Sequence, residues 1–135
     1  MKNLLLFTLL FTLLCCGASA QSKEFPYDSG NAFLRLCSSA EKDQGTLTDS
    51  ERQYEIGCML YIAGFVDGVE TGWAGTVADT KQEKLPKPFC RPPVEHGQMV
   101  KIVLKYVREN PEFAHQDTKL LALFAFQKAF PCPSK

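Results

Sequence analysis

The sequence predicts an all-α fold, a small bundle of about four helices clamped by two disulfide bonds. Apolar residues recur three and four positions apart in several separate segments, which is the spacing of one helix face, and no segment shows sustained strand-like alternation. Four cysteines follow an N-terminal export signal. An even number of cysteines in a small exported chain favours disulfides.

The first twenty residues have the features of a secretory signal peptide. A basic start is followed by residues 4–14, which are apolar apart from two threonines, and then by the small-residue cleavage site Ala18-Ser19-Ala20. The apolar stretch would cover about 16 Å as a helix, too little for a bilayer core of about 30 Å. We therefore expect export, cleavage after Ala20 and a single domain over residues 21–135.

Cys15 and Cys16, next to this cleavage site, raise the alternative of a lipid-modified cysteine, which the bulky Leu14 disfavours.

The charge of the mature chain is nearly balanced. Cleavage after Ala20 removes one of the 15 basic residues and leaves 14, against 15 acidic ones. Such a balance is not typical of proteins that bind nucleic acid or an anionic membrane surface. We expect no nucleic-acid partner and no stable membrane span.

The first two helices are indicated by their caps. The first is expected to begin at Ser29 or Asn31, which are good N-cap residues, and is followed by a polar loop over residues 41–49. The second begins at the sequence from Thr48 to Glu51, which fits a capping box. We expect this helix to run to about Gly72.

The middle of the second helix, residues 58–66, is apolar on nearly every face, which predicts a central helix buried by its neighbours. Gly64 and Gly68 lie one turn apart, and we interpret them as positions where another helix approaches closely. A buried carboxylate needs hydrogen-bond partners. Asp67 is therefore expected to have a structural role, bonded to a loop backbone or to a basic residue.

Residues 73–89 are expected to form the longest loop of the domain, because they contain two prolines and show no sustained period. Long loops in compact domains are usually functional or disordered. Trp73 stands where the helix gives way to this loop. Tryptophan is enriched at interface hot spots, although it also serves as an ordinary lid over a small core. The candidate partner-binding residues are Trp73, Thr76, Asp79, Lys81 and Glu83.

Prolines mark the last two helices. Pro92 and Pro93 suit the first turn of a third helix, which Asn110 and Pro111 end. A fourth helix is expected over residues 117–130. The connection between these helices is short, so they should pack antiparallel.

The expected helix order suggests how the cysteines pair. Cys90 precedes the third helix and Cys132 follows the fourth, so an antiparallel hairpin brings them within the Cα separation that a disulfide needs. Cys37, late in the first helix, and Cys58, in the second, can face each other across the polar loop. We therefore predict Cys37–Cys58 and Cys90–Cys132.

No reaction centre is visible in the sequence. His96 and His115 are far apart and belong to no zinc-ligand pattern. The chain has no Cys-x-x-Cys pair, no nucleophile elbow and no phosphate-binding glycine loop. We expect that the protein is not an enzyme and binds neither a metal nor a cofactor.

Four segments in order, with all four cysteines placed, resemble the Rap/Tai immunity family: residues 30–37, 58–68, 89–92 and 129–132. The resemblance implies a periplasmic, helical and often dimeric protein. Such a protein binds and inhibits an effector delivered by type VI secretion, a peptidoglycan amidase in the family's known cases, by inserting a surface loop or helix end into its cleft. The competing hypothesis is an exported helical module that binds a small apolar ligand or an envelope component.

Overall fold

A computed structural model describes residues 26–82 and 85–133, and these form four α-helices and no named strand. The helices are α2 (Gly30–Cys37), α3 (Asp49–Thr80), α4 (His96–Glu109) and α5 (Thr118–Ala129), with short 3-10 turns at Ser38–Glu41, Gln44–Thr46 and Pro111–Phe113. The all-α prediction is confirmed. The predicted signal peptide lies outside the described residues.

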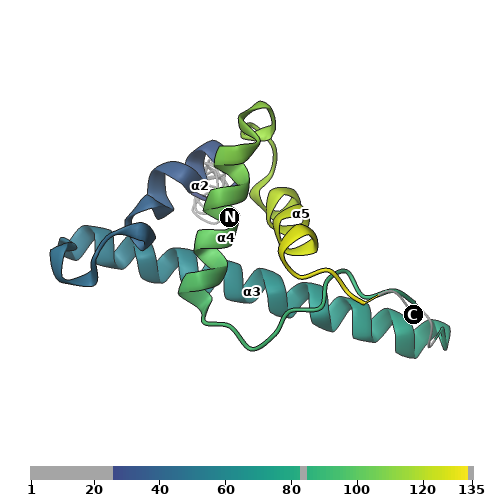
Figure 1. Ribbon diagram of the computed structural model, residues 1–135. Coiled ribbons are helices and arrows are strands. Elements are labelled where there is room, and N and C mark those ends of the chain that lie inside the picture. The colour runs from purple at the N-terminus through teal and green to yellow at the C-terminus, as the bar shows by residue number, and fades with distance from the viewer. Residues whose placement is uncertain (1–25, 83–84, 134–135) are drawn as a thin grey trace, which may run out of the picture.

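The long helix α3 forms the base of the molecule, and α2, α4 and α5 all lie on one side of it (Figure 1). Its 32 residues span about 48 Å at 1.5 Å per residue. The capping box is present as predicted, with Thr48 and Glu51 bonded to each other's backbone. No helix of the described residues is long and apolar enough to cross a membrane.

The prediction that the second helix ends at about Gly72 is wrong. The helix continues eight residues beyond Gly72, so Trp73 and the residues up to Thr80 are helical rather than part of a loop. The threonine hydroxyls follow this helical path, since Thr76 Oγ1 donates to the Gly72 carbonyl at 2.9 Å and Thr80 Oγ1 to the Thr76 carbonyl at 2.7 Å, each four residues back. The helix ends only at Lys81, whose φ of 54° is left-handed.

The core lies where α4 meets the other three helices. α4 contacts α2, α3 and α5, and its Val100, Val103 and Leu104 are fully buried. α3 contributes Ile62 and Val66 to the same cluster. The helix buried on several sides is therefore α4 and not, as the sequence suggested, α3.

The opposite side of α3 has no neighbour among the described residues. Leu60 is 68% exposed there, and a Cβ built on Gly64 or Gly68 meets no atom within 4 Å. The prediction that these glycines admit a neighbouring helix is wrong. Residues 58–66 are apolar around the whole helix, but among the described residues only one face of α3 packs against other helices.

Both disulfides are present as predicted. Cys37–Cys58 joins α2 to α3 with a Cα separation of 5.8 Å. Cys90–Cys132 joins the segment before α4 to the segment after α5, with a Cα separation of 4.8 Å. By restricting the unfolded chain, each contributes on the order of 3–4 kcal/mol.

Candidate protein-binding surface

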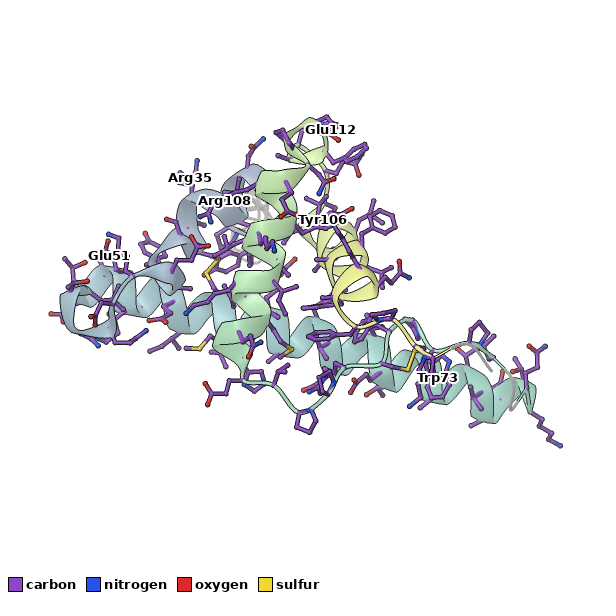
Figure 2. All side chains as sticks on the ribbon, in the orientation of Figure 1. Arg35, Glu51, Trp73, Tyr106, Arg108 and Glu112 are labelled. Carbon is purple, nitrogen blue, oxygen red and sulfur yellow. A yellow bond between two sulfur atoms is a disulfide. The ribbon has the colours of Figure 1, made fainter. Side chains whose placement is uncertain are left out.

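A non-helical segment, residues 85–91, lies along the C-terminal half of α3, where Trp73 is labelled in Figure 2. The indole Nε1 of Trp73 donates a hydrogen bond of 3.1 Å to the carbonyl of Pro86. The ammonium of Lys87 lies 5.0 Å from the centre of the same ring, within the range of a cation–π interaction. We call residues 85–91 the strap, because these contacts fasten it to α3.

A second contact fastens the strap to α3 one helical turn before Trp73. The guanidinium of Arg91 faces the carboxylate of Glu70, with Nε to Oε1 at 3.1 Å and Nη2 to Oε2 at 3.4 Å. A two-pronged arginine–carboxylate pair restricts orientation more than a single ion pair does. Both side chains are partly exposed, so the pair contributes more to position than to stability.

The far end of the strap is anchored to the core. Phe89 is 5% exposed and packs against Phe126 of α5 with ring centres 5.4 Å apart. The amide of Cys90 donates to the Phe130 carbonyl at 2.9 Å, beside the disulfide to Cys132. The strap is therefore held by an apolar contact, a backbone hydrogen bond and a covalent bond.

Between strap and helix lies a hollow of about 300 Å³. Two cations, Lys87 and Arg91, and one carboxylate, Glu70, surround an apolar wall that includes Trp73 and Phe89. A rigid aromatic side chain with a polar rim is the usual composition of an interface hot spot. We call this hollow and its lining residues the Trp73 surface.

The structure spreads the predicted partner-binding residues over the end of α3. Trp73 is half-buried at the strap, whereas Thr76 and Asp79 are exposed on the helix. Asp79 is six positions after Trp73, so it points to a different side. Lys81 caps the helix, and Glu83 lies outside the described residues. The side chains of Thr76, Asp79 and Lys81 are not among those that line the hollow.

Asp67 differs from its prediction. It is exposed on α3 and accepts no hydrogen bond from the residues that the structure describes, so the expected structural bonding is wrong. Its neighbour Glu70 makes the ion pair instead. The carboxylate that faces the strap is Glu70, which lies on the same side of α3 as Trp73. The sequence could show this shared side only if the helix was known to continue through Trp73.

The sequence reasoning missed Glu70, Lys87 and Arg91 as members of the surface. A signal existed for Arg91, because it follows Cys90 directly and the predicted disulfide already placed that segment near the helices. No signal pointed to Lys87, since its place over the indole depends on the path of the strap.

The described residues hold no group of three or more histidine, cysteine or acidic side chains that could bind a metal ion. All four cysteines in this part of the chain are in disulfides, so none is a free thiol nucleophile. What the Trp73 surface can do with these groups is present an aromatic ring and fixed charges to another molecule.

Comparison with protein families gave a match. The family model described as Rap1a immunity proteins matches residues 29–132, which covers all four helices and both disulfides. Neither the curated proteins nor the solved structures gave a match.

Proposed function

Because the chain belongs to the Rap1a immunity protein family, we propose that it protects its producer by binding and inhibiting a secreted effector through the Trp73 surface. The observation that carries the proposal is a tryptophan fixed by a strap that is itself clamped to the core by a disulfide. A surface already ordered before binding loses little conformational entropy when a partner docks.

We further propose that the effector arrives by type VI secretion and that it is a peptidoglycan amidase, the expectation drawn from the family resemblance. Inhibition then occurs in the periplasm. The predicted signal peptide and the two disulfides support this compartment, since disulfides persist in oxidising surroundings. Under this proposal the protein is an inhibitor and not an enzyme.

Co-expression tests the proposal. A candidate effector, a peptidoglycan amidase encoded beside the gene, would be directed to the periplasm of a bacterial host, with and without this protein. We expect growth arrest by the toxin alone, rescue by the wild-type protein and loss of rescue with Trp73→Ala. The matched control is Thr71→Ala, an exposed position on the solvent side of the same helix. The proposal would be contradicted if the wild-type protein gave no protection and formed no complex with the toxin.

A homodimer stays a prediction. Its support is on α5, where Leu120 and Phe124 are each 41% exposed one turn apart. A monomer mass by light scattering at micromolar concentration would contradict it. The competing hypothesis of a module for a small apolar ligand or an envelope component gains no support from the glycines of α3, because Gly64 and Gly68 face open space rather than a cavity.

A further inference from the structure

The disulfide that clamps the strap lies beside the groups that line the Trp73 surface (Figure 2). Cys132 Sγ is 3.9 Å from the carbonyl oxygen of Lys87, whose ammonium lies over the indole of Trp73. The other sulfur belongs to Cys90, the residue directly before Arg91. One covalent bond therefore adjoins both of the cations that the strap contributes to the surface.

The contacts that the strap makes with α3 are weak ones. The hydrogen bond from the indole to Pro86 and the ammonium of Lys87 are exposed, and the pair of Arg91 with Glu70 is partly exposed. Each such contact contributes little, because water competes for the same groups. Ordering a non-helical segment costs conformational entropy at every residue. The contacts with α3 alone therefore do not hold the strap in place.

The apolar anchor of the strap needs a second point to orient it. Phe89 is 5% exposed, so its ring keeps one point of the strap in the core. The bond from Cys90 to Cys132 follows at the next residue and fixes the direction in which Lys87 leaves the core. The hydrogen bond from the Cys90 amide to the Phe130 carbonyl joins residues outside the helices, so its geometry also depends on this disulfide.

The helical core is held by other contacts. α4 packs against α2, α3 and α5, and the buried Cys37–Cys58 bond joins α2 to α3. Cys90 and Cys132 are half-buried and lie before α4 and after α5. Local segments can open while the rest of a protein stays folded. Opening the Cys90–Cys132 bond should therefore release the strap and leave the helices packed.

We propose that the Cys90–Cys132 disulfide is a redox switch for the Trp73 surface: the oxidised protein binds its effector, and the dithiol form, still folded, does not. This inference rests on the proposed function, since it concerns the regulation of the same surface. To open the switch, a dithiol reductant passes two electrons and two protons to the two sulfurs, which become thiols, and is itself oxidised to a disulfide. The reverse exchange with a protein disulfide closes it, so inhibition is confined to oxidising surroundings.

Isothermal titration calorimetry with a catalytically inactive variant of the candidate amidase tests the switch. We expect the oxidised wild type to bind, and the paired variant Cys90→Ser with Cys132→Ser to bind about tenfold more weakly or less. The pair Cys90→Ala with Cys132→Ala removes the bond without adding hydroxyl groups and should give the same result. No reductant is present in these titrations, so the thiols of the amidase are not affected.

The matched control restores a covalent clamp of another kind. Wild-type protein is opened with a mild reductant, which is then removed, and the two thiols are joined with dibromobimane. We expect the bridged protein to recover most of the affinity, because the strap is again held at two points. An opened sample whose thiols are blocked singly with iodoacetamide should stay weak.

Hydrogen exchange of the protein alone reports on the strap without an effector. In the paired serine variant, the amide that bonds to the Phe130 carbonyl should exchange faster than in the wild type. The amides of Val103 and Leu104, whose side chains are fully buried, should keep their protection. Far-ultraviolet circular dichroism should be unchanged.

Each contrary result has a distinct meaning. Absence of binding by the oxidised wild type would overturn the proposed function, and the switch with it. Equal binding by the wild type and both paired variants would overturn the switch alone. Loss of helicity in both paired variants would overturn it too, since the bond would then hold the fold rather than the surface.

Discussion

Glu51 fastens the start of α3 with its carboxylate, and the same contacts shift its acidity. One oxygen accepts from Lys42, and the other accepts from the Thr48 amide at 3.0 Å and the Thr48 hydroxyl at 2.9 Å. These bonds favour the charged form and lower the pKa of Glu51 from 4.5 to about 2, with the Lys42 bond as the largest cause. The stabilisation is present above the unfolded pKa and is lost as pH falls through the folded one.

We therefore expect Glu51→Gln to lose less free energy of unfolding than the wild type as the pH is lowered. The free energy of unfolding of the wild type should fall between about pH 4.5 and pH 2, and the variant should fall less over that window. Urea unfolding at several pH values measures both. Asp67→Asn, at an exposed carboxylate on the same helix with no bond in the described residues, should follow the wild type. Parallel wild-type and Glu51→Gln profiles would contradict the assignment.

Gly30 is a residue where the fold leaves little room for a side chain. A Cβ there would lie 2.5 Å from Leu121 Cδ1 and 2.9 Å from the Ala114 carbonyl oxygen. The leucine can move, but the backbone oxygen is held, because it also accepts from the Asn31 amide at 2.7 Å. We expect Gly30→Ala to destabilise by about 1–3 kcal/mol through overpacking. Thermal or urea unfolding measures the change, and an unchanged midpoint would refute it.

At the scale of the helices, glycine-to-alanine changes on the solvent face of α3 are expected to have the opposite effect to Gly30→Ala. Gly64 and Gly68 are exposed, with nothing within 4 Å of an added Cβ. Alanine there removes backbone freedom from the unfolded chain without a clash, so Gly64→Ala and Gly68→Ala should each stabilise by about 0.5–1 kcal/mol. Gly30→Ala is the natural comparison, since the same change is expected to destabilise there. Loss of stability in both α3 variants would mean that this face is covered in solution.

Helix α3 also shows what the sequence could and could not predict. Its start was predictable because the capping box is local, between Thr48 and Glu51. Its end was not, because Gly75, Thr76 and Asp79 lower helix propensity without breaking a helix, and the strap that packs on Trp73 comes from residues 85–91. Periodicity likewise showed that residues 58–66 are apolar but not which face lacks a neighbour.

The same distinction applies to the Trp73 surface. Trp73 itself was identifiable as the chain's single tryptophan at a predicted boundary. Glu70 and Arg91, which line the same surface, are 21 positions apart, and they meet only because the Cys90–Cys132 disulfide and Phe89 turn the strap back along α3. Long-range packing of this kind leaves no periodic trace in the chain.

Across the whole molecule, the two disulfides hold different parts of the structure and differ in how easily they are exposed. Cys37 and Cys58 are completely buried between α2 and α3, so a reductant reaches them only when those helices separate. Cys90 and Cys132 are half-buried and join two non-helical segments. Their bond holds the strap rather than the helical core. Local opening therefore exposes the second disulfide at a lower cost in free energy than the first.

We expect a mild reductant to open the two bonds in order. Alkylation and peptide mapping should label Cys90 and Cys132 first, while far-ultraviolet circular dichroism stays unchanged. The emission of the single tryptophan should shift to the red in the same step, because Trp73 loses its bond to the strap. The paired variant Cys90→Ser with Cys132→Ser should show this shifted emission before any reductant is added. Simultaneous labelling of all four cysteines would instead mean that strap and core open together, and that the Trp73 surface is no more easily released than the helices beneath it.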